Sequence, residues 1–92
     1  RDSGRNNDGG RNGSQRDKRN KDEKQKELIA LAIAVTQRCD ACIGFHMRTL
    51  VKLGATRQEV AETLGMCVYM GGGPAMMYAA DAIAAFDEFS AT

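Results

Sequence analysis

Residues 27–36 read Glu-Leu-Ile-Ala-Leu-Ala-Ile-Ala-Val-Thr, and this apolar run is the strongest indication of the fold in the sequence. A helix built from it carries apolar residues on nearly every side, so it is expected to be buried on most sides. The apolar run from Leu28 to Val35 has eight residues, whereas a membrane-spanning helix needs roughly 18–20. The stretch therefore predicts a buried helix in a small helical domain, with no membrane partner.

Three further helices are predicted downstream, separated by short turn signals. The first runs from about Cys39 to Leu53, and Gly54 follows where a glycine commonly ends a helix. Residues 56–59, Thr-Arg-Gln-Glu, have the form of a capping box that starts the next helix. The three glycines at 71–73 end that helix, and Pro74 begins the last one, which runs to about residue 89. No strand pattern is present, so the sequence predicts an all-α fold with about four helices in the core.

Upstream of Glu27 the composition changes abruptly. Residues 1–26 contain no hydrophobic residue and carry a net charge of +4, whereas residues 27–92 carry −3. A segment without apolar side chains cannot bury surface to offset the entropy of ordering. We therefore expect a polar, flexible tail at residues 1–20 and a helical domain at residues 21–92, with helix-forming residues already frequent from Lys18. The tail has no aromatic residues among its charges, and its acidic residues dilute the basic ones, which argues against nucleic acid binding.

Composition also predicts compartment and assembly. The 92 residues include three cysteines, an odd number that argues against a secreted disulfide framework, and the first residues form no secretory signal. A functional thiol pair in a cytoplasmic protein fits better. All the hydrophobic residues, 42% of the chain, lie after residue 26. A monomer of this size cannot enclose that much apolar surface, so we expect a homo-oligomer.

The chemistry is concentrated in residues 39–46, Cys-Asp-Ala-Cys-Ile-Gly-Phe-His. Cys39 and Cys42 lie one turn apart at the start of a helix, and His46 follows on the same helical stripe. The free N–H groups of a helix N-terminus favour a thiolate, and a nearby imidazole can accept the thiol proton. His46 is the single histidine of the chain. This spacing predicts a redox-active dithiol that forms a disulfide reversibly.

Two other interpretations of these residues remain open. A zinc site needs about four ligands, and Cys67 is the available fourth after Cys39, Cys42 and His46. Cys67 lies in an apolar run, however, where a small buried core residue is expected. The other interpretation is purely structural, with two buried cysteines and a hydrogen-bonded histidine. Glu27 is either a first-turn glutamate favoured by the helix dipole or a carboxylate that orients His46, if the two helices pack antiparallel.

Taken together, these motifs resemble the alkylhydroperoxidase, or AhpD-like, branch of the carboxymuconolactone decarboxylase family. The resemblance rests on the stretch 27–36, the Cys39, Cys42 and His46 spacing, the segment from Gly54 to Glu59, and the run Tyr-Met-Gly-Gly-Gly-Pro-Ala at residues 69–75. It covers about residues 22–90. Family members usually carry an apolar helical segment before the position of Glu27, where this chain has its polar tail.

The resemblance implies an all-helical fold that assembles as a trimer or hexamer. It implies a thiol-dependent peroxidase or disulfide reductase in antioxidant defence, with a hydroperoxide substrate, an external dithiol reductant, no cofactor and no metal. By position, Cys42 matches the peroxide-attacking thiol, Cys39 the resolving thiol, and His46 and Glu27 the proton relay. The alternatives are a non-enzymatic helical oligomerisation module and a zinc site made of the same Cys and His residues.

Overall fold

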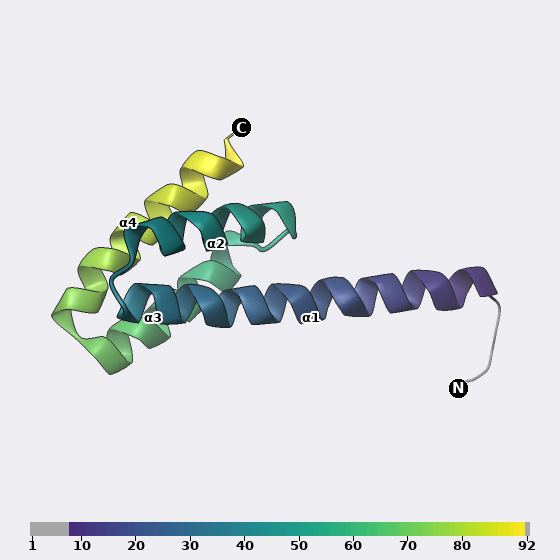
Figure 1. Cartoon of the computed structure of the whole chain (residues 1–92), viewed down its shortest axis with the longest axis horizontal. Helices are drawn as coiled ribbons and strands as arrows, with labels where there is room; N and C mark the ends of the chain where they lie inside the picture. The colour runs from purple at the N-terminus through teal and green to yellow at the C-terminus, as the bar shows by residue number, and fades with distance from the viewer. Residues whose placement is uncertain (1–7, 92) are drawn as a thin grey trace.

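The computed structural model describes the backbone of residues 8–91 and the side chains of residues 18–91. It contains α1 (Asp8–Thr36), α2 (Asp40–Lys52), α3 (Arg57–Gly71) and α4 (Gly73–Ser90). The described residues include no strand, which confirms the predicted all-α fold. Figure 1 shows α1 as the long axis of the molecule, with the other three helices gathered along its C-terminal half.

Apolar side chains from all four helices meet in one core. Its largest fully buried members are Leu31, Val35, Met47, Leu50 and Val60. Burying a side chain of this kind contributes roughly 1.5–3 kcal/mol relative to leaving it exposed, so these residues account for much of the cohesion between the helices. Among the described residues, no helix is both long enough and apolar enough to cross a membrane.

The apolar stretch of α1 is buried on one face and open on the other, which differs from the expectation of burial on most sides. Leu31, Ala34 and Val35 face the core, whereas Ile29 and Ile33 are 54% and 55% exposed. The reason is that α2, α3 and α4 cover one side of α1 within this chain. The outer face of α1 is therefore an apolar surface without a partner in the described chain.

The predicted turn chemistry is confirmed at the later helix ends. Gly54 has φ 82° and follows α2, with the N–H groups of Gly54 and Ala55 bonded to the carbonyls of Val51 and Leu50. Two such reverse bonds around a left-handed residue form the Schellman ending of a helix. Thr56 and Glu59 form the expected capping box. Gly72, with φ 73°, separates α3 from α4, and α4 begins at Gly73, one residue before Pro74.

The start of α1 is earlier than the sequence pattern predicts. Residues 8–20, expected in the polar tail, continue the helix, while residues 1–7 of that tail lie outside the described residues. An existing helix extends at the cost of fixing one residue for each new hydrogen bond, so it can run past the point where apolar periodicity ends. The boundary between a tail and a domain at residue 21 stays a prediction.

Candidate active site

Cys39 lies at the junction of α1 and α2 and serves both helices. Arg38 has φ 59°, and the N–H groups of Arg38 and Cys39 donate to the carbonyls of Val35 and Ala34, both at 3.1 Å. This is a Schellman ending of α1 with arginine where glycine is usual. Cys39 is also the N-cap of α2. The turn therefore fixes the backbone of Cys39 from both sides.

The sulfurs of Cys39 and Cys42 form a disulfide across the first turn of α2, with the two Cα atoms 5.2 Å apart. The backbone N–H of Cys42 also donates a hydrogen bond to Cys39 Sγ at 3.2 Å. Both residues are half-buried. The free N–H groups of this turn carry positive partial charge, which would stabilise a thiolate once the disulfide is reduced.

Glu27 and His46 meet across the interface of α1 and α2. The two helices run antiparallel, which is the condition the sequence argument required (Figure 1). Glu27 Oε1 lies 2.8 Å from His46 Nδ1, and the side chains are 23% and 24% exposed. A carboxylate oxygen accepts hydrogen bonds, so in this contact the ring donates from Nδ1, and Nε2 is left for another partner. The structure thus brings together Glu27 and His46, with Cys42 one turn before His46 on the same stripe.

Phe45 flanks the histidine and was not singled out by sequence reasoning. Its ring is 67% exposed and contacts the His46 ring edge-on, with centroids 5.2 Å apart. It precedes His46 directly in the sequence, but only the packing of α2 shows that it faces outward. Phe45 therefore adds an open apolar surface beside the polar pair.

Cys67, the third cysteine, lies on α3 and points into the hydrophobic core. Its side chain is buried, and its thiol lies 3.7 Å from the carbonyl oxygen of Ala32 in α1. Burial raises the pKa of the Cys67 thiol, so the unreactive protonated form is favoured. Within residues 18–91, no three His, Cys, Asp or Glu side chains group as metal ligands. These positions lend no support to the zinc alternative.

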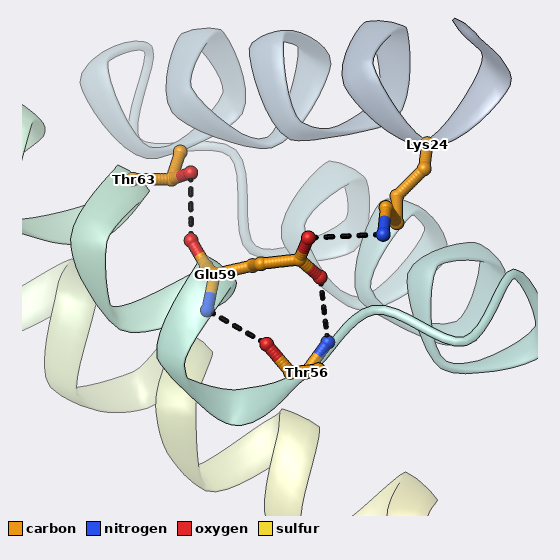
Figure 2. Close-up of polar contacts among 4 residues, drawn as sticks. All are labelled: Lys24, Thr56, Glu59 and Thr63. Carbon is orange, nitrogen blue, oxygen red and sulfur yellow. Dashed lines mark hydrogen bonds and ion pairs between the residues drawn. The ribbon is translucent and has the colours of Figure 1, made fainter. Parts of the chain in front are cut away.

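A second polar contact joins α1 to α3, one turn before Glu27 in the sequence. Lys24 Nζ lies 2.9 Å from Glu59 Oε2, while Glu59 Oε1 accepts the backbone N–H of Thr56 at 2.8 Å (Figure 2). Glu59 in turn donates its own N–H to Thr56 Oγ1, and its carbonyl accepts from Thr63. The Thr56 N–H and, secondarily, Lys24 lower the pKa of the Glu59 carboxyl. The sequence predicts the capping box but gives no sign of Lys24.

Comparisons with known proteins converge on one family. The family model described as the carboxymuconolactone decarboxylase family matches residues 11–85, beginning earlier than the resemblance at residue 22. An uncharacterized protein of Cupriavidus necator is 48% identical over 66 residues, covering 72% of this chain and 58% of its own. Uncharacterized protein 4 in the cox locus of Paracoccus denitrificans is 34% identical over 67 residues, covering 73% and 60%.

A solved structure agrees with these relatives. The crystal structure of an apo carboxymuconolactone decarboxylase family protein from Legionella pneumophila superposes with a TM-score of 0.72 at 69% identity. The match covers 73% of this chain and 60% of that one. The chain thus spans about three-fifths of the length of the relatives it matches.

Proposed function

The chain belongs to the carboxymuconolactone decarboxylase family, and we propose that it is a thiol-dependent peroxidase or disulfide reductase of the AhpD-like branch. The observation that carries the proposal is the contact of 2.8 Å between Glu27 and His46. His46 lies on α2, the helix whose first turn bears the Cys39–Cys42 disulfide. Two-electron thiol chemistry requires a proton acceptor close to one cysteine and a second cysteine within bonding distance of the first. His46 lies one turn from Cys42, and Cys39 is bonded to Cys42.

The proposed cycle starts from the reduced dithiol. His46 Nε2 takes the proton of Cys42, and the thiolate attacks the terminal oxygen of a hydroperoxide. The O–O bond breaks, Cys42 becomes a sulfenic acid, and the leaving alkoxide takes the proton back from His46 and departs as an alcohol. The Cys39 thiol then attacks the Cys42 sulfur, water leaves, and the disulfide forms.

An external dithiol completes the cycle. It reduces the Cys39–Cys42 disulfide by exchange through a mixed disulfide and is itself oxidised. Glu27 keeps the imidazole in the tautomer that accepts at Nε2 and stabilises the imidazolium after proton transfer. The need for continual reduction fits the cytoplasm, where thiols are kept reduced.

The decisive experiment measures peroxide consumption with a dithiol reductant. Cys42→Ser should abolish it, because the attacking sulfur is gone. Cys39→Ser should allow one turnover and leave a sulfenic acid at Cys42 that dimedone traps. His46→Gln should lower the rate by about 100- to 10,000-fold, the usual range of general acid–base catalysis.

Cys67→Ser is the matched control. It removes a thiol that lies outside the site, so turnover should persist even if stability falls by roughly 1–3 kcal/mol from burying a polar group. Turnover unaffected by loss of either Cys39 or Cys42 would contradict the proposal. Stoichiometric zinc together with dependence on Cys67 would instead favour the metal-site alternative.

We also propose that the chain functions as a homo-oligomer, a trimer or a hexamer by the family resemblance. Among residues 18–91, eight large apolar side chains are more than half exposed, including Tyr69, Met70 and Met77 at 79%, 75% and 70%. Two apolar surface pockets of about 300 and 270 Å³ include the exposed Met76 and Met66 in their walls. Surface of this kind marks a protein interface more often than a solvated face.

A further inference from the structure

Glu27 can orient His46 only if α1 has the correct rotation about its axis and the correct position along its axis relative to α2. We propose that Lys24 and Glu59 are positioning residues whose ion pair fixes α1 against α3 and thereby sets the Glu27 carboxylate on His46 Nδ1. Lys24 and Glu27 are three residues apart and share a face of α1 in adjacent turns. The effect on turnover rests on the proposed function, whereas the effect on His46 does not.

The location of Lys24 along α1 makes it the natural point of attachment. Residues 18–23 are exposed, and Lys24 is the first described side chain of α1 that is partly covered, at 24% exposure. Figure 1 shows the N-terminal half of α1 projecting away from the other helices. The turn that carries Lys24 is therefore where α1 reaches the body of the protein, directly before the turn that carries Glu27.

Glu59 provides a rigid partner for this attachment. One carboxylate oxygen is fixed by the Thr56 backbone N–H at 2.8 Å, which leaves the other to bind Lys24 at 2.9 Å (Figure 2). The Glu59 backbone is fixed by the α3 helix and by its bond to Thr56 Oγ1. Because this carboxylate has a fixed place on α3, its ion pair with Lys24 fixes where α1 lies relative to α3. A surface glutamate that rotated freely would not constrain α1 in this way.

Two substitutions break the ion pair from opposite ends. Lys24→Gln removes the cation and leaves the capping box intact. Glu59→Gln leaves Lys24 in place, and its single amide oxygen still serves the capping box, so the amide nitrogen is left to face Lys24. Lys24→Arg keeps the cation and should restore the contact. Arg57→Gln is the matched control, because it breaks an ion pair of α3 that joins Asp87 of α4 and does not involve α1.

The primary measurement is the tautomer of the single imidazole, read from its ¹⁵N chemical shifts. It is made at the alkaline end of a pH series, where the shifts no longer change with pH. Wild type, Lys24→Arg and Arg57→Gln should show the proton on Nδ1. Lys24→Gln and Glu59→Gln should both move the population toward Nε2–H. Wild-type shifts in both variants would overturn the proposal, as would a change in Lys24→Gln alone, since that outcome indicates a direct charge effect of the lysine.

Peroxide turnover supplies the second measurement. Lys24→Gln and Glu59→Gln should lower it by about tenfold, in line with the cost of a displaced catalytic group. Lys24→Arg and Arg57→Gln should remain near wild type. A wild-type protein that consumes no peroxide would defeat the proposed function while the ¹⁵N shifts still decide the positioning role. Normal turnover with an altered tautomer would overturn the link between the ion pair and catalysis.

Discussion

At the scale of single residues, Glu59 gives the protein a defined response to acid. Its pKa is lowered in the folded state, first by the Thr56 N–H and then by Lys24, so folding favours the ionised carboxylate. A group of this kind stabilises the fold above its ordinary value, here 4.5, and the stabilisation is lost as the pH falls through the lowered folded value. Acid destabilises the fold through Glu59 because, near and below pH 4.5, this carboxylate binds a proton more readily in the unfolded chain than in the folded one.

We therefore predict that Glu59→Gln lowers the free energy of unfolding at pH 7 by about 0.5 kcal/mol, the size of a solvent-screened ion pair. The difference from wild type should shrink as the pH is lowered from 5 toward 3. Urea unfolding followed by circular dichroism at each pH measures both values. A difference that stays constant over this range would show that Glu59 does not contribute through its charge.

At the scale of the helices, α1 and α2 end in the same backbone motif with different residues at its left-handed position. Arg38 holds φ 59° at the end of α1, and Gly54 holds φ 82° at the end of α2. A residue with a Cβ pays about 1–2 kcal/mol in this conformation, and glycine avoids that cost. A Cβ placed on Gly54 would contact nothing within 4 Å, so conformation alone decides the effect there.

The two positions therefore make a matched pair of predictions. Arg38→Gly should raise the free energy of unfolding by about 0.5–1 kcal/mol, because the gain at φ 59° exceeds the extra entropy of an unfolded glycine. Gly54→Ala should lower it by about 1 kcal/mol. Thermal unfolding of the two variants measures both. An unchanged or lower free energy of unfolding in Arg38→Gly would mean that the arginine side chain has a stabilising role of its own.

Residue patterns anticipate the contacts within helices better than those between them. The capping box of Thr56 and Glu59 lies within four residues, and its chemistry can be read directly from the sequence. The Cys39, Cys42 and His46 stripe likewise follows from helical spacing. The Lys24–Glu59 contact joins residues 35 positions apart and depends on how α1 packs on α3, which no local pattern records. The early start of α1 was not predicted, because the polar residues 8–20 have no apolar periodicity that would indicate a helix.

At the scale of the whole molecule, the exposed apolar face predicts the state of assembly. Light scattering at low micromolar concentration should give a mass several times the 10.0 kDa of one chain. Met70→Glu places a charge on a side chain that is 75% exposed within one chain, so it should lower that mass and leave the helical circular dichroism unchanged. Lys21→Glu, at an exposed polar position of α1, is the control and should not change the mass. A folded wild-type monomer at this concentration would contradict the prediction.

The double role of Cys39 also determines which amino acids position 39 can accept. Its side chain caps α2, a task that Ser, Thr, Asp and Asn perform well in other helices. A library of variants screened for folding alone should therefore retain those four residues at position 39 and lose the large aliphatic ones. The same library screened for reversible disulfide formation should retain only Cys. The difference between the two tolerance profiles separates what the position contributes to architecture from what it contributes to electron transfer.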